Sequence, residues 1–227
     1  MANKPTKNSS GRGYRDLTVK VKTAKGRKIS STNWLQRQLN DPYVQRAKKD
    51  GFRSRAAYKL SEIDAKYRLL WPGLRVLDLG SAPGGWIQVA IARGCKAVGV
   101  DLLPIDPIPG AILLEADIED VETDRLLLEA LGGPADLILS DLAPSATGQR
   151  AVDRLRSEAM GEVVLALAPS LLKPGGHLLL KLLRGADAVL TSAAKTQFKS
   201  VRLVRPDATR RESSEVYLLA QDFFGAD

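Results

Sequence analysis

The chain has little of the side-chain chemistry on which many enzymes depend. Its 227 residues include one cysteine, Cys95, and one histidine, His177. A single cysteine builds neither a disulfide framework nor a zinc site of paired cysteines. A single histidine excludes a multi-histidine metal centre and leaves His177 as the one possible base for a Ser-His-Asp triad. We therefore expect no metal site in this protein.

Long apolar runs are missing as well. No stretch approaches the ~20 apolar residues of a membrane span, and the first residues contain no apolar segment typical of a secretory signal. Hydrophobic residues make up 44% of the chain and charged residues 26%, which is close to the average of globular proteins. We expect a soluble, cytoplasmic, monomeric protein that does not bind membranes.

Acidic residues are scarce in the first third of the chain. Residues 1–70 hold 18 Lys and Arg against 5 Asp and Glu, a net charge of +13, whereas the remaining 157 residues hold 16 against 21, a net of −5. A basic segment joined to a mildly acidic body is typical of proteins that bind the phosphate backbone of nucleic acids. A basic tail that only keeps the protein soluble is the alternative.

The composition divides the chain into three parts. Residues 1–30 are rich in Lys, Arg, Gly, Ser and Thr and predict a flexible basic tail. Residues 31–72 predict a helical, basic, RNA-binding segment, with one helix capped by Ser31–Asn33 and another that starts near Ser54. Residues 73–227 predict a Rossmann-like domain, because short aliphatic runs alternate there with helical stretches.

Continuous aliphatic runs separated by helices predict parallel strands that are covered on both faces. The last two runs leave no room for a helix between them and must pair antiparallel. We therefore expect an α/β fold, with a seven-stranded, mostly parallel sheet and helices on both faces. The expected strands are Arg75–Leu79, Ala97–Leu102, Ala111–Glu115, Ala135–Ser140, His177–Leu183, Ser200–Val204 and Glu215–Ala220; the expected helices are Gly85–Arg93, Thr123–Leu131, Val152–Leu172 and Asp187–Phe198.

A glycine-rich loop follows the first expected strand and reads Asp78-Leu-Gly80-Ser-Ala-Pro83-Gly84-Gly85-Trp86. Glycines at the carboxyl end of this strand let the backbone approach a bound nucleoside closely. The spacing differs from G-x-G-x-x-G and Pro83 lacks an N–H donor, which disfavours the pyrophosphate of NAD or FAD. A plain turn between strand and helix is the alternative.

Acidic residues follow the next two strands. Asp101 lies about 20 residues past the loop, where an acidic side chain meets ribose hydroxyls, and Asp117 lies beside the expected adenine position. A glycine turn and carboxylates without a phosphate-binding group suit S-adenosylmethionine, which carries a sulfonium cation and no phosphate. Solvated strand-end acids are the alternative for either aspartate alone. The cofactor is expected to contact Gly80, Pro83, Gly84, Gly85, Trp86, Asp101, Asp117 and Asp141.

Charged residues also mark the later strands. Strand four ends at Asp141, strand five carries Lys181 in an aliphatic run, and the last strand begins at Glu215. A lysine in such a run is desolvated unless it has a partner or a task; a lysine that extends to solvent from an edge strand is the alternative. No aromatic residue follows Pro144 that could stack on a flipped base, which disfavours methylation of a base amino group. Methylation of cytosine C5 needs a cysteine nucleophile, and Cys95 lies at the wrong end of the sheet, so this reaction is disfavoured as well.

Taken in order, these segments resemble the FtsJ/RrmJ-type ribose 2′-O-methyltransferases. The resemblance runs from about Ser31 to about Gln221 and implies a Rossmann-like, S-adenosylmethionine-dependent methyltransferase fold. It rests on Arg53–Leu60, Asp78–Trp86, Asp101–Pro104, Ser140–Pro144, Lys181 and Ser214–Tyr217. It also implies a Lys-Asp-Lys-Glu tetrad, which falls on Lys59, Asp141, Lys181 and Glu215. Ser214 departs from the family pattern, in which a basic residue precedes the glutamate.

The resemblance implies in-line methyl transfer from the sulfonium to a ribose 2′-oxygen. Lys181 is expected to be the base, for which it must be neutral. Asp141 and Glu215 would hold Lys181 and the ribose, and Lys59 would position the ribose or its phosphate. The resemblance is closest to the bacterial members of the family, which methylate a uridine of 23S ribosomal RNA. It therefore implies the same substrate here, and we expect the reaction to take place on the assembled large ribosomal subunit.

Several alternatives stay open. The chain could methylate transfer RNA or an mRNA cap, although an aromatic content of 5% leaves few residues for a cap-binding slot. It could be a ribosome-assembly factor that binds RNA without catalysis. An NAD-dependent oxidoreductase is the third class, which the glycine spacing and Pro83 disfavour.

Overall fold

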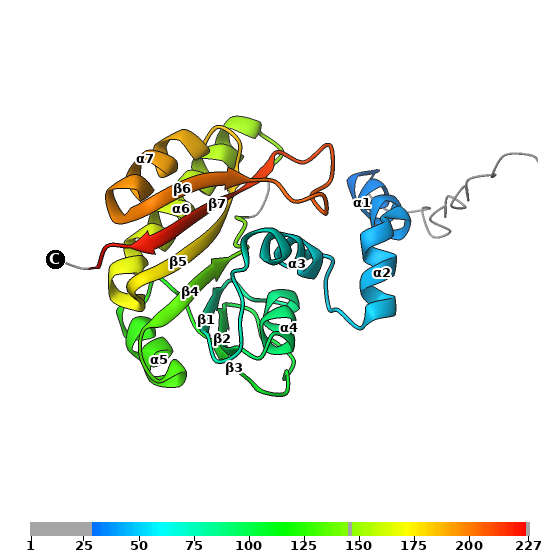
Figure 1. Ribbon diagram of the computed structural model, residues 1–227. Helices are drawn as coiled ribbons and strands as arrows, with labels where there is room; N and C mark the ends of the chain where they lie inside the picture. Colours follow the sequence, from blue (N-terminus) through cyan, green and yellow to red (C-terminus); the bar gives the residue numbers. More distant parts are fainter. Residues whose placement is uncertain (1–28, 145–146, 226–227) are drawn as a thin grey trace, which may run out of the picture. The chain divides into compact units, whose positions relative to one another are not determined.

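The computed structural model describes residues 29–144 and 147–225, so the expected basic tail, apart from its last two residues, lies outside the described residues. The chain forms two compact units that divide between Gln45 and Arg46. Figure 1 shows α1, Ile29–Asn40, followed by α2, Pro42–Asp50. The predicted cap at Ser31–Asn33 is wrong, because these residues lie inside α1.

The second unit is built on one seven-stranded sheet of order β3-β2-β1-β4-β5-β7-β6 (Figure 1). The pairs among β1 to β5 are parallel, and β7 is antiparallel to both β5 and β6. The Rossmann-like fold and the antiparallel closing pair are thereby confirmed. The strands are β1 Arg75–Leu79, β2 Lys96–Asp101, β3 Ala111–Glu115, β4 Ala135–Ser140, β5 Leu172–Leu183, β6 Phe198–Val204 and β7 Glu215–Phe223.

The helices of this unit agree with the expected boundaries to within two residues. They are α3 Ala56–Tyr67, α4 Gly85–Ala92, α5 Val121–Leu131, α6 Arg150–Leu171 and α7 Asp187–Gln197. The largest difference in a strand is the start of β5, five residues before the expected His177. Leu172 already pairs with Ala135, and the register shifts before Leu137 pairs with His177.

Two apolar layers cover the sheet, one on each face. Side chains from α5, α6 and α7 pack in one cluster with Leu77 of β1. Side chains from α3 and α4 pack in the other cluster with Val76, the preceding residue of the same strand. This alternation follows from the two-residue period of a strand. Among the described helices, none is both long enough and apolar enough to cross a membrane.

The topology gathers the functional candidates at one edge of the sheet. Parallel strands β1, β2, β4 and β5 all end at this edge, and β7, which runs the other way, begins there. The register pairs Leu183 with Glu215 and Lys181 with Tyr217. Helix α3 packs against α4 on one face, and this packing brings Lys59 to the same edge.

Candidate active site

Four charged side chains meet at this edge. Lys59 Nζ lies 2.8 Å from Glu215 Oε2 and 3.8 Å from Asp141 Oδ1. Lys181 Nζ lies 3.0 Å from Asp141 Oδ1 and also donates a hydrogen bond to the carbonyl of Asp141. Each lysine side chain is 9% exposed. The four residues that the family resemblance places in a tetrad therefore form one contiguous cluster of two lysines and two carboxylates.

The strand geometry explains why Lys181 points into this cluster. Its neighbours Leu180 and Leu182 pack in the layer under α5 to α7, so Lys181 lies on the opposite face, where α3 packs. Strand β5 lies between β4 and β7, in the interior of the sheet. The alternative of a lysine that reaches solvent from an edge strand is therefore excluded.

Tyr217 completes the cluster and was not among the predicted site residues. Its hydroxyl donates a hydrogen bond of 2.9 Å to Asp141 Oδ1, and its ring centroid lies 5.5 Å from Lys59 Nζ. Burial, together with the charges of Asp141 and Glu215, raises the pKa of Tyr217 well above 10. The phenol therefore stays protonated and acts as a donor. The strand period was the available signal, since Tyr217 lies on the same face as Glu215.

The glycine loop folds as the sequence predicts. Gly80 and Gly84 have φ angles of +79° and +101°, a region that L-residues with side chains rarely adopt. A Cβ atom on Gly84 would lie 2.6 Å from Ile108 Cδ1, so the loop is also closely packed. At Gly85 a Cβ would clash with Ser54 Oγ. Larger residues at these positions would force the loop or these neighbouring side chains to move.

The loop lines a pocket of about 220 Å³ that extends to Asp141. The pocket wall also includes Ser54 and Ala56 at the start of α3, Asp78 on β1 and the buried ring of Trp86. Trp86 Nε1 donates a hydrogen bond of 2.8 Å to the carbonyl of Ala56. This bond fixes the glycine loop to the helix that carries the first tetrad lysine.

Asp78 is a buried carboxylate without a partner. It is 1% exposed, and neither oxygen has a hydrogen-bond partner within the described chain. Burial, reinforced by the charges of Asp141 and Asp101, raises the pKa of Asp78 well above its usual range. A buried, unpaired carboxylate is costly unless a cation or donor meets it. Because Asp78 lines the pocket, the pocket is suited to a cationic ligand.

Asp101 and Asp117, which the sequence predicts to contact the cofactor, do not line this pocket. Asp101 accepts backbone hydrogen bonds of 2.9 Å from Ala82 and from Leu103, one on each carboxylate oxygen. Asp117 is exposed, and its Oδ1 accepts the N–H of Glu119 at 3.0 Å. Each carboxylate oxygen has a second lone pair with which it could accept a hydrogen bond from a ligand hydroxyl or amine.

Arg53 fixes the segment after β2 against the glycine loop, a role that the sequence did not indicate. Its Nη1 donates to the carbonyls of Pro83 at 3.1 Å and Asp106 at 2.6 Å, and its Nη2 donates to Pro107 at 2.8 Å. Its backbone N–H donates to the Gln88 side chain at 2.8 Å. Three carbonyl acceptors from two loops hold those loops at a fixed separation.

The single cysteine and the single histidine lie away from the tetrad. Cys95 immediately precedes β2, and burial raises the pKa of its thiol to about 11. His177 lies in the first half of β5, where its Nδ1 accepts the N–H of Asp222 at 3.2 Å. Because its pKa is raised, the Cys95 thiol is protonated at neutral pH, and a protonated thiol is a weak nucleophile. Cys95 is at the amino edge of the sheet, as predicted, opposite the charged cluster.

Comparison with known proteins agrees with this geometry. The model of the FtsJ-like methyltransferase family matches residues 52–223. The chain is 50% identical over 234 residues to Ribosomal RNA large subunit methyltransferase E of Mesorhizobium japonicum, covering 100% of this chain and 88% of that protein. It is 49% identical over 238 residues to the protein of the same name in a Ruegeria species, covering 99% and 100%. The alignments include residues before Ser31.

A solved structure is also similar. It is the crystal structure of a Plasmodium falciparum protein described as a ribosomal RNA methyltransferase, with a TM-score of 0.70 and 31% sequence identity. The likeness covers 77% of this chain and 100% of that one.

Proposed function

Since the chain belongs to the FtsJ-like methyltransferase family, we propose that it transfers the methyl group of S-adenosylmethionine to the 2′-oxygen of a uridine in 23S ribosomal RNA. The observation that carries the proposal is the position of Asp141. This residue holds Lys181 by a 3.0 Å ion pair and also lines the glycine-loop pocket. Asp141 therefore belongs both to the pocket that we assign to the cofactor and to the charged cluster.

The residues of the pocket fit S-adenosylmethionine by charge. The unpartnered carboxylate of Asp78 suits the ammonium of the cofactor's methionine end, and Pro83 leaves the loop without one of the N–H donors that a pyrophosphate needs. When bound, S-adenosylmethionine supplies an electrophilic methyl group on a cationic sulfur. We assign the remaining contacts to Gly80, Gly84, Gly85, Trp86, Asp101, Asp117 and Asp141.

Within the charged cluster, Lys181 Nζ accepts the proton of the ribose 2′-hydroxyl. A hydroxyl is a weak nucleophile until this proton leaves, so the base must lie within hydrogen-bond reach of it. Asp141 fixes the position of Lys181 through the side-chain and carbonyl contacts. Lys59, paired with Glu215 at 2.8 Å, remains the cation that positions the ribose or its phosphate.

The substrate assignment rests on the relatives and on charge. The relatives that align with the whole chain carry the name Ribosomal RNA large subunit methyltransferase E. The net charge of +13 in residues 1–70 suits binding of an RNA backbone. We propose the large ribosomal subunit as the partner, a monomer as the active form and the cytoplasm, where that subunit is assembled in bacteria, as the site of the reaction.

The test is transfer of labelled methyl from S-adenosylmethionine to large ribosomal subunits that lack the modification. Lys181→Ala serves as the inactive variant, and Lys195→Ala, which removes an exposed lysine in the last turn of α7, serves as the charge control. Label in a uridine ribose with the wild type and the control, absent with Lys181→Ala, supports the proposal. Label on transfer RNA in place of the subunit would overturn the substrate, and label on no RNA would overturn the function.

A further inference from the structure

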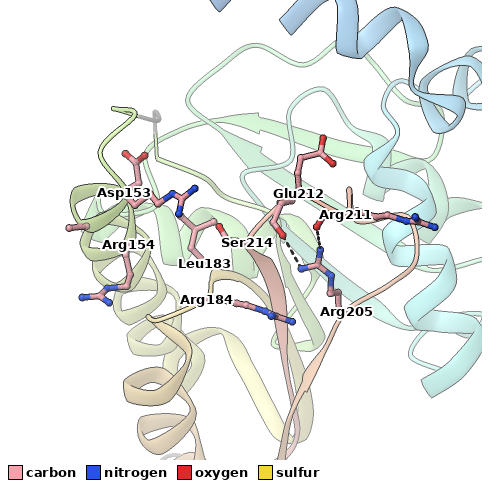
Figure 2. A pocket seen from close by; sticks show the side chains of 11 residues that line it. Asp153, Arg154, Leu183, Arg184, Arg205, Arg211, Glu212 and Ser214 are labelled. Atoms are coloured by element: carbon pink, nitrogen blue, oxygen red, sulfur yellow. Dashed lines mark hydrogen bonds between the residues drawn. The ribbon is translucent and has the colours of Figure 1, made fainter. Parts of the chain in front are cut away.

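Figure 2 shows a second pocket, of about 810 Å³. Its lining residue Ser214 immediately precedes Glu215 of the charged cluster. Its walls are the first turns of α6, the turn that follows β5, and residues 205–214 between β6 and β7. Five arginines line it, namely Arg150, Arg154, Arg184, Arg205 and Arg211. None of the proposed catalytic or cofactor residues is among its lining residues, so it is a separate site from the glycine-loop pocket.

Arg205 differs from the other four arginines, because its guanidinium donates hydrogen bonds to backbone carbonyls of the same chain. Its Nη1 donates to Ser213 at 2.9 Å and Glu215 at 3.1 Å, and its Nη2 donates to Arg210 at 2.9 Å and Arg211 at 3.3 Å. Figure 2 shows some of these bonds as dashed lines. Arg205 therefore fixes the loop that leads into β7.

The remaining four arginines are available to a ligand. Arg150, Arg154, Arg184 and Arg211 are exposed, and the part of the chain that the structure describes contains no side-chain hydrogen bond or ion pair for any of them. Like-charged guanidinium groups around one cavity repel each other, so their placement favours an anionic occupant.

Two acids line the same pocket, but they do not neutralise it. Asp153 is already hydrogen-bonded within the protein, because its Oδ1 accepts the backbone N–H and the hydroxyl of Thr147, both at 2.7 Å. The hydrogen bonds from Thr147 lower the pKa of Asp153, which keeps it ionised. Glu212 is exposed. With five arginines against two carboxylates, the pocket has a formal charge of +3.

The position of the pocket indicates which anion it binds. Leu183, a lining residue, pairs with Glu215 and lies two residues beyond Lys181 on β5. At about 3.4 Å per residue, this separation is about 7 Å along the strand, which is on the scale of one nucleotide step along an RNA chain. With the target ribose at Lys181, the phosphate of the neighbouring nucleotide would therefore lie near the arginines.

We propose that the arginine pocket binds the phosphate backbone of the substrate RNA next to the methylated nucleotide, with Arg154, Arg184 and Arg211 as phosphate ligands. This inference rests on the proposed function. Guanidinium groups bind phosphate oxygens in bidentate pairs, which fixes the orientation of the strand as well as its affinity. The arginines would contact phosphates and not bases, so the pocket would position the RNA strand, and with it the ribose at Lys181, without recognising the sequence.

The test compares Arg154→Ala, Arg184→Ala, Arg211→Ala and the triple variant with Arg125→Ala. Arg125 is an exposed arginine on α5 whose ion pairs with Glu122 and Glu129 lie at the surface, so its loss controls for a general change in charge. The binding constant for a substrate RNA fragment is measured at several salt concentrations. KM and kcat for methyl transfer and the Kd for S-adenosylmethionine are measured alongside.

Each single variant is expected to weaken RNA binding about three- to tenfold and to reduce the slope of log K against log salt by about 0.7. The values of kcat and of the cofactor Kd should stay within about twofold of the wild type, because the arginines contact neither the charged cluster nor the cofactor pocket. Arg184→Lys should recover part of the affinity, since lysine keeps the charge but not the bidentate geometry.

Three outcomes would overturn the inference: unchanged RNA affinity and salt slope in the triple variant, an equal loss in Arg125→Ala, or a fall in kcat with unchanged RNA affinity. Failure of the proposed function is a different result. A wild-type protein that binds RNA through these arginines but transfers no methyl would keep the pocket and overturn the methyltransferase assignment.

Discussion

The hydroxyl of Tyr217 donates to the same carboxylate oxygen of Asp141 that Lys181 contacts. Lys59 approaches this oxygen as well, at 3.8 Å. Asp141 Oδ1 is therefore the common partner of Tyr217 and Lys181, and it forms a longer ion pair with Lys59. A change at Tyr217 should therefore alter the position of Lys181 although the tyrosine itself has no assigned contact with the substrate.

Tyr217→Phe should lower kcat about tenfold, because it removes one charge-assisted hydrogen bond to Asp141, worth roughly 1.5–3 kcal/mol, and keeps the ring. RNA affinity and cofactor affinity should stay within about twofold. Steady-state kinetics with calorimetric cofactor binding measures both. An unchanged kcat would show that the tyrosine has no part in positioning Lys181.

Lys181→Ala should abolish methyl transfer and leave the Kd for S-adenosylmethionine within about tenfold. Lys181→Arg is the sharper variant, because it keeps the positive charge beside Asp141 but arginine does not release its proton at neutral pH. Both variants should therefore be inactive in single-turnover assays. Substantial activity of Lys181→Arg would falsify the assignment of the base.

Asp78→Asn should stabilise the cofactor-free protein at neutral pH. The raised pKa of Asp78 in the folded state means that the folded protein holds this proton more tightly than the unfolded chain does. Stability is then lost as the pH rises above the unfolded value of about 3.9 and through the folded pKa. The gain in Tm from Asp78→Asn should accordingly be present at pH 7 and vanish at about pH 4.

The same substitution should weaken S-adenosylmethionine binding by tenfold or more, about 1.4 kcal/mol, because it removes the anionic partner of a cationic ligand. Thermal unfolding with and without cofactor measures both effects. A lower Tm at every pH would indicate that the carboxylate has a structural role.

Asp101→Ala should raise the Kd for S-adenosylmethionine about tenfold or more while leaving kcat at saturating cofactor within about threefold. The side chain accepts N–H groups from Ala82 in the glycine loop and from Leu103, so its loss releases two loops as well as a candidate ribose contact. Asp101→Asn keeps an acceptor for one of these bonds and should have a smaller effect. An unchanged Kd in Asp101→Ala would contradict the assignment.

RNA binding by the full chain should weaken steeply with salt, because residues 1–70 carry a net charge of +13 and each neutralised phosphate releases counterions. Equilibrium binding to a substrate fragment between low and high salt measures the slope. A binding constant that does not change over this range would show that the basic segment does not contact the RNA backbone.

The sequence predicted the framework of the site because the strand ends carry it. Lys181 interrupts an aliphatic run and Asp141 ends one, so periodicity alone placed them at the same edge of a parallel sheet. Asp78 and Tyr217 were not predicted as site residues, because both lie inside segments that look like ordinary core strands. Only the register of β5 and β7, and the burial of β1, shows what these polar groups contact.

Two further features were not predicted, one for a local reason and one because it depends on tertiary structure. Helix α2 was missed because its composition is polar, although Asp41-Pro42 is a recognisable helix start, with Asp41 Oδ1 accepting the N–H of Tyr43 at 3.0 Å. The arginine pocket draws Arg154, Arg184 and Arg211 from three separate segments. No spacing in the sequence relates them, because the insertion of β7 beside β5 brings them together.

That insertion also makes the charged cluster depend on contacts between distant parts of the chain. Strand β7, residues Glu215–Phe223, lies between β5 and β6 in the sheet although it follows both in the sequence. Glu215 meets Lys59 across a separation of 156 residues, and Tyr217 meets Asp141 across 76 residues. The cluster therefore forms only when most of the second unit is folded, so its integrity reports global and not local folding.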